Sequence, residues 1–408
     1  MATTRGARRL KRCHHQGNQV GIFVSALHST ELIRGLTHDF YRYPARFSPA
    51  FARAAIELFT EPGDLILDPF AGGGTSLVEA RVLGRPAVGV DLSPLATFIS
   101  KVKTSVLTPD ELAGAKRWNR LVLRRLHLWR KGPKANGWAS DGYHRNINDR
   151  STWPIRKSIE LALQSASLLE QPRLERFIRC AVLRTGQWAL DGRDRIPTAS
   201  EFRTALTQNL QSMIQGAAAF AKAARMADRS SPTVGFRRTL SVQADAGEIS
   251  DLNCFENRPA PKLVLTSPPY PGIHVLYNRW QVLGRRESPA PFWIADEPSD
   301  VGAADLTFGD RRIHAESRYF KEVERAFASV SEVLDRTSIV VQLVAFSQPT
   351  KQLPLYLDAV SNAGFREVYL SGTNGTRHWR GVPNRKWYAD QWGINGSRKE
   401  VLLFHKLR

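Results

Sequence analysis

Residues 65–75 of the 408-residue chain have the sequence Leu-Ile-Leu-Asp-Pro-Phe-Ala-Gly-Gly-Gly-Thr. Three apolar residues that end in an acid predict a short buried strand, and a helix is expected from about Thr75 to Leu83. The glycines between them let the backbone approach a ligand closely, and a helix N-terminus has free N–H groups. No lysine follows the last glycine, so this is not a Walker A loop. On its own, the stretch is also compatible with a tight structural turn.

A second strand is predicted at residues 87–90, and it ends at Asp91. An acid at this place in an α/β nucleotide-binding unit usually binds the ribose hydroxyls. Ser93 and Pro94 predict the start of the next helix, since serine is a good cap and proline is tolerated in the first turn. Asp91 could equally be the helix cap, so both roles are open for it at this point.

The rest of the chain divides into a helical part and a second α/β part. Between 106 and 238, apolar residues recur at helical spacing and strand patterns are absent. After 238 a buried strand is predicted at 263–265, a helix at 318–334 and a long strand at 338–346, and an apolar strand at 401–404 closes the chain. The sequence therefore predicts one α/β domain that is interrupted by a helical insertion.

The charge of the chain favours a polyanionic partner. Lys and Arg number 58 against 38 Asp and Glu, which gives a net charge of +20. Residues 106–238 contain 24 basic and 11 acidic residues, a net charge of +13. Nucleic acid is the first expectation and an anionic membrane surface the second, while an evenly solvated basic face is the alternative. The candidate phosphate contacts in this insertion are Arg117, Arg120, Arg124 and Arg125.

Other classes of protein are disfavoured by composition. No apolar run reaches the roughly 18 residues that a spanning helix needs, and the basic first dozen residues have no apolar stretch typical of a secretory signal. Cys13, Cys180 and Cys254 are far apart, so we expect neither a disulfide framework nor a cysteine zinc site, and no metal site at all. We expect a cytoplasmic, prokaryotic protein that acts at the nucleoid, with residues 1–35 as a basic flexible arm.

A second chemical motif follows the strand at 263–265. Ser267-Pro268-Pro269-Tyr270 begins one residue after it, and two prolines cannot continue a ladder of backbone hydrogen bonds. Their carbonyls can accept hydrogen bonds from an exocyclic amine, and Tyr270 adds a flat ring on which a planar base can stack. A rigid proline turn is the alternative for this segment taken alone. Combined with the glycine loop, the motif indicates a site for a base.

With these motifs the sequence resembles the amino-methylating DNA methyltransferases that use S-adenosylmethionine. The family's cofactor loop is similar to residues 68–75, and its catalytic tetrapeptide is similar to residues 267–270. Residues 38–47 resemble the segment that closes over the methionine end of the cofactor, and residues 241–246 resemble the strand whose acid contacts adenine. The resemblance leaves residues 1–35 and 106–238 unmatched. The tetrapeptide follows the glycine loop here, whereas many family members with Ser-Pro-Pro-Tyr have the reverse order.

The resemblance implies a Rossmann-like class I methyltransferase fold with a largely parallel central sheet. Its parts would be 36–105 for cofactor binding, 239–408 for catalysis and 106–238 as a helical, DNA-recognising insertion. Ser267, Pro268, Pro269 and Tyr270 would be catalytic. The implied cofactor-binding residues are Tyr43, Arg46, Asp68, Pro69, Phe70, Gly72, Gly74, Thr75, Asp91 and Asp245. For Asp245 a loop-capping role is the alternative. His38 could be purely structural, and Phe47 could simply pack on the next helix.

Within that family, serine at the first position of the tetrapeptide is typical of cytosine-N4 enzymes, whereas adenine-N6 enzymes usually have Asp or Asn. The hydroxyl of Ser267 could accept from the amine and donate to the ring, which suits the adjacent N4 and N3 of cytosine. N4-methylation of a flipped cytosine in double-stranded DNA is therefore expected, with adenine-N6 as the alternative. Cytosine-C5 methylation needs a cysteine nucleophile in a proline context, which the chain lacks.

Two further expectations concern partners. The aromatic and basic run at 378–388, which includes Arg380 and Arg385, could contact phosphates and splayed bases, or it could be a hairpin packed on the sheet. A cognate restriction or defence nuclease is a possible partner. The rival functions are methylation of an exocyclic amine in RNA and DNA binding without catalysis, although the intact glycines and tetrapeptide argue against the second.

Overall fold

The fold is known from a computed structural model, which describes residues 19–29, 34–43, 47–129, 137–230, 239–271, 279–284, 286–299, 308, 315–370, 375–381 and 399–408. One sheet contains β1 (Ile66–Asp68), β2 (Ala87–Asp91), β3 (Thr239–Gln243), β4 (Leu263–Thr266), β7 (Ile339–Ala345), β8 (Phe365–Val368), β9 (His378–Gly381) and β10 (Lys399–Leu407). A separate hairpin consists of β5 (Trp280–Val282) and β6 (Arg286–Ser288).

The strand order of the main sheet is β3-β2-β1-β4-β7-β10-β8, and β9 also pairs with β10. The first five strands are parallel to one another, and β10 runs antiparallel to its neighbours. From β1 the chain adds β2 and then β3 on one side of the sheet, and it then returns to add β4 on the other side of β1. The winding direction therefore changes at β1. The predicted Rossmann-like α/β fold with a largely parallel sheet is confirmed.

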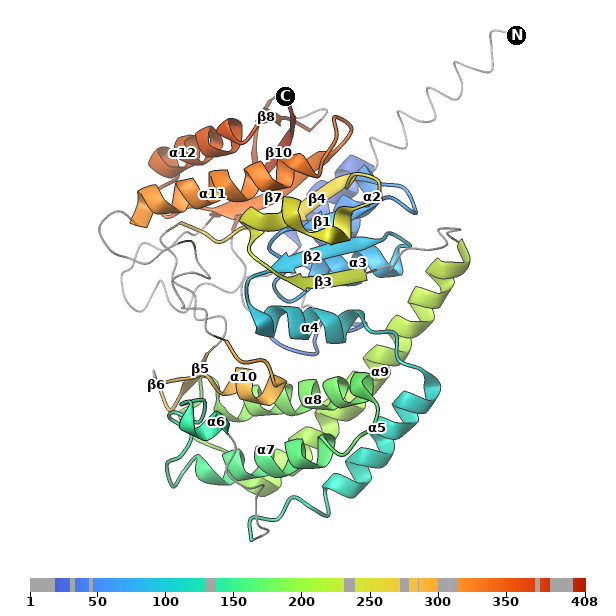
Figure 1. Ribbon diagram of the computed structural model, residues 1–408, viewed down its shortest axis with the longest axis vertical. Helices are drawn as coiled ribbons and strands as arrows, with labels where there is room; N and C mark the ends of the chain where they lie inside the picture. The colour runs from blue at the N-terminus through green and yellow to red at the C-terminus, as the bar shows by residue number, and fades with distance from the viewer. Residues whose placement is uncertain are drawn as a thin grey trace.

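Helices cover both faces of this sheet (Figure 1). The helices of the described residues are α2 (Pro49–Phe59), α3 (Thr75–Val82), α4 (Pro94–Thr104), α5 (Pro109–Val122), α6 (Gly137–Ser140), α7 (Trp153–Ala166), α8 (Pro172–Leu190), α9 (Ala199–Ser230), α10 (Ala290–Ala295), α11 (Ala315–Glu332) and α12 (Pro349–Asn362). Because side chains alternate along a strand, Leu263 and Leu265 pack towards α2 and α3, while Val264 packs towards α11 and α12.

A helix over residues 19–28 corrects the prediction for the N-terminal arm. Its Phe23 and Leu27 are fully buried beside Phe51 and Phe404. Residues 1–18 lie outside the described part of the chain. The basic composition of the first dozen residues had suggested an unpacked segment, but the apolar pair at i and i+4 places one face of this helix on the sheet domain.

The insertion is helical as its periodicity predicts, but its boundary differs from the prediction. The hydrophobic core of α5, α7, α8 and α9 also includes Trp280, Val282 and Phe292, which come from β5 and α10. Gly186 on α8 lies so close to Trp280 that an added Cβ would come within 2.7 Å of its ring. We call residues 106–230 and 279–299 together the helical region. The second segment was not expected to belong to it.

The helical region is joined to the sheet domain by buried and partly buried polar contacts. Arg81 on α3 makes two hydrogen bonds to the carboxylate of Asp228, at 2.6 and 3.0 Å, near the end of the long helix α9. The indole N–H of Trp280 donates to the hydroxyl of Tyr41 at 3.1 Å, and both side chains are buried. No helix within the described residues is both long and apolar enough to span a bilayer.

Candidate active site

The strands β1, β2 and β4 end side by side, and each ends next to a residue that the sequence singled out. Asp68 is the last residue of β1, Asp91 is the last of β2, and Ser267 follows β4 directly. In doubly wound sheets, ligands bind outside the carboxyl ends of the strands at the point where the winding direction changes. That point is β1 in this sheet, so the glycine loop and the tetrapeptide flank the position where a ligand is expected.

Asp68 fixes the two loops relative to each other. Its carboxylate accepts hydrogen bonds from the Thr266 hydroxyl at 2.8 Å, from the backbone N–H of Phe70 at 3.2 Å and from the Ser76 hydroxyl. The side chain is 1% exposed, and burial raises its pKa to about 6 although these hydrogen bonds oppose the rise. The prediction that Asp68 contacts the cofactor is therefore corrected, because its oxygens are enclosed by protein donors. It joins β1, α3 and β4.

The glycine loop is shaped by close packing on Tyr43. Gly72 and Gly74 have φ values of +48° and +72°, which favour glycine. A Cβ added to Gly72 would lie 3.2 Å from the Tyr43 ring, and one added to Gly73 would lie 2.9 Å from the Tyr43 Cβ. Tyr43 is therefore packed against the loop, and its contact with the cofactor stays a prediction. The loop is a tight structural turn, and this does not prevent it from also binding a ligand.

The buried Lys103 supports this loop from behind, a role that the sequence did not suggest. Its ammonium group donates to the Gly73 carbonyl at 2.9 Å, and the residue is fully buried on α4. The neighbouring N–H groups are also bonded within the protein, that of Gly72 to Asp91 at 2.8 Å and that of Gly74 to the Ala71 carbonyl at 2.8 Å, so the loop is held from several sides. A lysine within an amphipathic helix normally indicates a solvated position, so no signal in the sequence could have identified it.

Asp91 retains the capacity to bind a ribose. One carboxylate oxygen accepts from the Gly72 N–H at 2.8 Å, and the other accepts from the Ser93 N–H at 2.9 Å. A carboxylate has about four acceptor positions, so each oxygen can accept one more hydrogen bond. The residue is partly exposed, and Ser93, whose hydroxyl accepts from Ala96, is the helix cap. Burial raises the pKa of Asp91 to about 6. These groups fit the ribose end of S-adenosylmethionine.

Three other predicted cofactor residues lie around the same loop. Thr75 is the first residue of α3 and is 4% exposed, while Pro69 is buried. Phe70 is partly exposed and meets the ring of Phe308 edge-on at 5.5 Å. Of the three, Phe70 has the surface with which to contact a ligand. The other two shape the loop.

Asp245, the predicted adenine contact, accepts several hydrogen bonds from protein groups. Its carboxylate accepts from the Gly247 N–H at 2.7 Å and pairs with the guanidinium of Arg325 through contacts of 2.8 and 2.7 Å. The alternative loop-capping role is therefore present in the structure. Since 29% of the side chain is exposed, an additional ligand contact at this residue stays a prediction.

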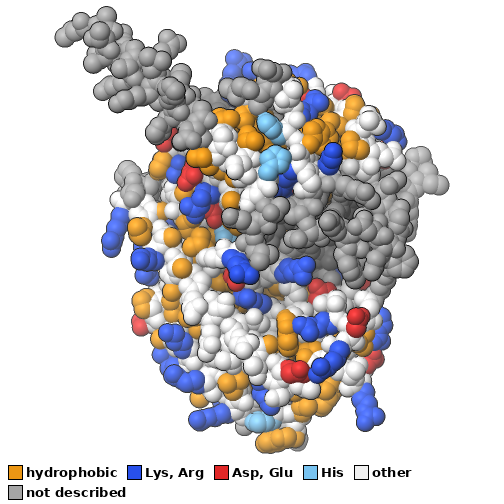
Figure 2. Space-filling view, turned by 180° about the vertical axis from the view of Figure 1, so that it is seen from behind, with side chains coloured by type: hydrophobic (Ala, Val, Ile, Leu, Met, Phe, Trp, Pro, Cys, Tyr) orange, Lys and Arg blue, Asp and Glu red, His pale blue; other side chains and the backbone are white. Residues whose placement is uncertain are grey.

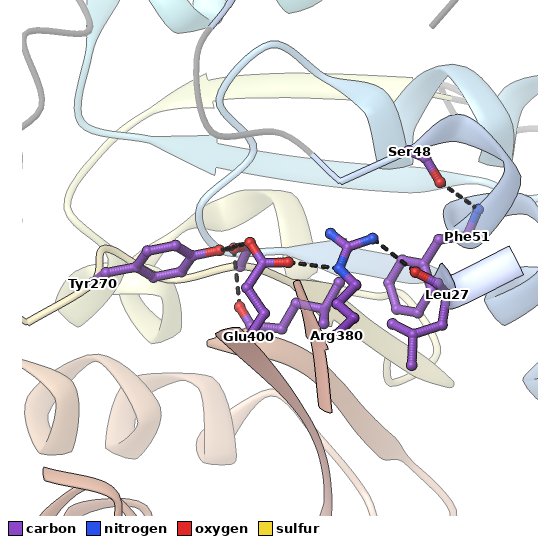
Figure 3. A network of polar contacts seen from close by, with 8 residues as sticks. Leu27, Ser48, Phe51, Tyr270, Arg380 and Glu400 are labelled. Carbon is purple, nitrogen blue, oxygen red and sulfur yellow. Dashed lines mark hydrogen bonds and ion pairs between the residues drawn. The ribbon is translucent and has the colours of Figure 1, made fainter. Parts of the chain in front are cut away.

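Hydrogen bonds hold the tetrapeptide in place, and Figure 3 shows the one from Tyr270 to Glu400. The Ser267 hydroxyl is 2.9 Å from the Leu343 carbonyl and 3.1 Å from the Tyr270 hydroxyl. The Tyr270 hydroxyl donates to Glu400 at 2.7 Å, and the Pro269 carbonyl accepts from Tyr319 at 2.7 Å. Ser267, Pro269 and Tyr270 are partly exposed, whereas Pro268 is buried.

The prediction that Arg380 binds DNA is wrong. Arg380 is 6% exposed, and its guanidinium donates to Glu400 at 2.6 Å and to the Leu27 carbonyl at 3.0 Å. It lies on β9, which pairs with β10, so residues 378–381 form a strand of the sheet. Arg46 and Arg385 lie outside the described residues. Glu400, the second residue of the strand β10, gave no sign of function in the sequence.

Two weaker candidates have structural roles. His38 is buried and is 2.7 Å from the carboxylate of Glu79, which indicates a structural histidine. Phe47 is 7% exposed and packs edge-on against Phe51 of α2, with ring centroids 5.7 Å apart.

The four arginines proposed to contact DNA lie on or just after α5, and all are exposed. α4 starts after the carboxyl end of β2 and runs back along the sheet. α5 therefore begins near the amino ends of the parallel strands. In Figure 1 α5 is on the far side of the helical region from β5, β6 and α10. Figure 2 shows Lys and Arg spread over the face in view, without one dominant patch. Arg117, Arg120, Arg124 and Arg125 are thus accessible but not next to the tetrapeptide.

A sequence family matches the first quarter of the chain, and curated proteins are similar to this chain over short stretches. Residues 9–100 match the sequence model of a family described as DNA methylase. A type II methyltransferase, M.MvaI of Kocuria varians, is 41% identical over 83 residues, which are 20% of this chain and 18% of that protein. M.MjaII of Methanocaldococcus jannaschii is 35% identical over 66 residues, which are 16% of this chain and 12% of that protein.

One further similarity is to a curated tRNA methyltransferase and another is to a solved structure. A tRNA (guanine(10)-N2)-dimethyltransferase of Methanothermobacter thermautotrophicus is 45% identical over 51 residues, which are 12% of this chain and 15% of that protein. The solved structure of TrmN from Thermus thermophilus has a TM-score of 0.32 and 12% identity, and the match covers 90% of this chain and 50% of that one.

The aligned part of the chain spans between 12% and 18% of the length of these curated relatives. The family match over residues 9–100 contains the glycine loop and Asp91 and ends before the tetrapeptide. The family match and the type II relatives confirm the resemblance of this chain to the amino-methylating DNA methyltransferases, and they imply S-adenosylmethionine as the methyl donor.

Proposed function

We propose that the protein transfers a methyl group from S-adenosylmethionine to the exocyclic N4 amine of a cytosine that is flipped out of duplex DNA. The observation that carries this proposal is the position of the two motifs at the edge where β1, β2 and β4 end. The 2.8 Å hydrogen bond from Thr266 to Asp68 ties the glycine loop to the tetrapeptide. A cofactor on one loop and a base on the other would therefore be held next to each other.

On the cofactor side, Asp91 would bind the ribose hydroxyls and Gly72 would leave space for the methionine part beside Tyr43. The start of α3 adds free N–H groups at the same loop. When bound, S-adenosylmethionine supplies an already activated methyl group, so the protein needs chiefly to position the acceptor amine.

On the base side, Ser267 and the Pro268 carbonyl would accept hydrogen bonds from the amine. The lone pair of an aromatic amine is conjugated with the ring, and acceptors for its two hydrogens favour the pyramidal form in which the lone pair can attack. Tyr270 would stack on the flipped base, which cannot be reached within the duplex. All three groups come from the same short loop after β4.

The choice of cytosine rests on serine at the first position of the tetrapeptide, which resembles the cytosine-N4 enzymes. Adenine-N6 is the alternative base, because its amine makes the same demand for two acceptors. We further propose that the net positive charge of the helical region helps to bind the DNA backbone, with the arginines of α5 as candidate contacts. A prokaryotic cytoplasmic setting with a partner nuclease would suit such an enzyme.

A second candidate function is methylation of an exocyclic amine in RNA, which the local similarity to a tRNA (guanine(10)-N2)-dimethyltransferase favours. Transfer of tritiated methyl groups to duplex DNA and to tRNA, measured in parallel, separates the two functions. We expect label in DNA. Label in tRNA alone would replace the proposed substrate, and label in neither would contradict the proposed activity.

A further inference from the structure

A polar network joins the tetrapeptide to three distant parts of the chain (Figure 3). The Tyr270 hydroxyl donates to one oxygen of Glu400 at 2.7 Å, and the Nε of Arg380 donates to the other at 2.6 Å. Arg380 also donates to the Leu27 carbonyl at 3.0 Å. The network therefore links the loop after β4 to β10, to β9 and to the helix over residues 19–28.

The ion pair within this network is deeply buried. The side chains of Arg380 and Glu400 are 5% and 7% exposed. Burying a charged pair costs solvation free energy that the attraction between the charges often does not recover, so such a pair is weak evidence for a role in stability. Its consequence here is chemical. The Glu400 carboxylate accepts from a guanidinium, and a carboxylate can only accept hydrogen bonds, so it cannot donate to Tyr270.

Counting the hydroxyl protons gives the direction of each hydrogen bond. There are three short oxygen–oxygen contacts, namely Ser267 to Leu343, Ser267 to Tyr270 and Tyr270 to Glu400, but only two hydroxyl protons. The Tyr270 hydroxyl donates its hydrogen bond to the Glu400 carboxylate. Ser267 then directs its own proton to the Leu343 carbonyl or to the Tyr270 oxygen. In both arrangements its lone pairs are left to accept.

This count corrects one part of the sequence interpretation. A serine whose proton is used within the protein can accept a hydrogen bond from an amine, but it does not also donate to the ring nitrogen of cytosine. The acceptor role is the one that amine methylation needs. It depends on a carboxylate that lies on a different strand.

We propose that Glu400 and Arg380 are positioning residues that orient the hydrogen bonds through Tyr270 and so present Ser267 as an acceptor to the target amine. The inference rests on the proposed function and adds two residues to it. Neither residue would touch the substrate, since both are buried behind the tetrapeptide.

Glu400→Gln tests the direction of the network with an isosteric change. The amide oxygen must face the Arg380 donor, so the NH₂ group faces Tyr270 and donates to it. The Tyr270 hydroxyl must then donate its hydrogen bond to Ser267. There it competes with the target amine for the Ser267 oxygen. We expect the single-turnover rate of methyl transfer to fall about tenfold, a typical loss for one misdirected hydrogen bond. Affinity for S-adenosylmethionine should change less than twofold.

Tyr270→Phe in the Glu400→Gln background makes the test specific. The second change removes the competing hydroxyl proton, so the double variant should be faster than Glu400→Gln and similar to Tyr270→Phe. Equal or additive losses would contradict the inference, because a merely destabilising Glu400→Gln would not be rescued by a further change. Glu400→Gln with an undiminished rate would contradict it as well.

Glu367→Gln is the matched control. Glu367 lies on β8, which is adjacent to β10, and its carboxylate pairs with Arg377 at 2.7 Å. It makes no contact with the tetrapeptide among the described residues. Its rate should equal that of the wild type, and thermal unfolding of every variant checks the fold. A wild-type protein that methylates neither DNA nor RNA would remove the proposed function and this inference together, whereas an active wild type with no rescue would remove the inference alone.

Discussion

The carboxyl edge of the sheet and the helical region use charge in opposite ways. At the edge, Asp68, Asp91 and Glu400 each accept hydrogen bonds from protein donors; Asp68 and Glu400 are buried and Asp91 is partly exposed. On α5, the arginines project into solvent. A short motif at the end of a strand can therefore be assigned to a site, because strand ends meet at one edge. A charged composition specifies a kind of partner without specifying a surface.

The largest expected effect is that of Gly72→Trp. A Cβ at this position already lies 3.2 Å from the Tyr43 ring, and the φ of +48° is strained for any L-residue. An indole there fills the space for the methionine part of the cofactor, so binding of S-adenosylmethionine in calorimetric titration should be lost. Gly21→Trp on an exposed helix position is the control and should bind normally. Wild-type affinity in Gly72→Trp would contradict the cofactor assignment.

Asp91→Ala should have the next largest effect. It removes a charged acceptor for the ribose hydroxyls, about 1.5–3 kcal/mol of binding free energy, or roughly a ten- to hundredfold loss of affinity. Calorimetry measures the loss, and Asp358→Ala on the exposed face of α12 is the control. If Asp91→Ala binds S-adenosylmethionine as the wild type does, Asp91 serves only the turn at Gly72.

Tyr270→Ala should slow methyl transfer without weakening cofactor binding. The missing stacking surface is worth about 1–3 kcal/mol, which corresponds to roughly a ten- to hundredfold lower rate. Single-turnover kinetics and calorimetry on the same variant separate the two effects. Ser267→Ala should likewise act on the rate, because the amine is then polarised less. Equal losses of rate and of cofactor affinity would mean that the whole edge had been disturbed.

The pH dependence of cofactor binding should be smaller and should depend on Asp91. Burial raises the pKa of this carboxyl to about 6, so it becomes protonated as the pH falls through that value. A protonated carboxyl accepts less well from the ribose, and affinity should fall by up to about tenfold per pH unit below 6. Titrations between pH 5 and 8 measure this, with Asp91→Asn as the pH-independent control. A wild-type profile that is flat over this range would argue against a ribose contact at Asp91.

The smallest expected effect concerns the helical region. Replacing Arg117, Arg120, Arg124 and Arg125 by Ala should flatten the salt dependence of duplex binding by about 0.9 in slope for each phosphate that the variant no longer neutralises. Fluorescence anisotropy at several salt concentrations measures the slope. An unchanged slope would mean that this face is only solvated and that the DNA lies on another side of the helical region.

Much of the fold followed from residues close together in the sequence. The strand and loop at 65–75, the capping by Ser93 and the helical spacing at 106–238 are all local patterns, and the structure contains the elements they predict. The packing of β5 and α10 into the helical region was not predictable, because Trp280 meets α8 across about a hundred residues of sequence.

The site was predictable only where one motif supplies its own geometry. Ser267 and Tyr270 belong to one tetrapeptide, but their partners Leu343 and Glu400 come from strands that approach only in the folded sheet. Arg380 is a case in which a local sequence pattern led to a wrong prediction. Its aromatic and basic neighbours resemble a nucleic-acid contact in the sequence, whereas the fold buries it against Glu400.

Identification of the methylated nucleoside tests the central claim most directly. Duplex DNA incubated with the protein and S-adenosylmethionine is digested to nucleosides and analysed by mass spectrometry, with Ser267→Ala as the reduced-rate control. The account predicts N4-methylcytosine that depends on the wild-type tetrapeptide. N6-methyladenine as the sole product would contradict the choice of base, and unmodified DNA beside methylated RNA would contradict the proposed substrate.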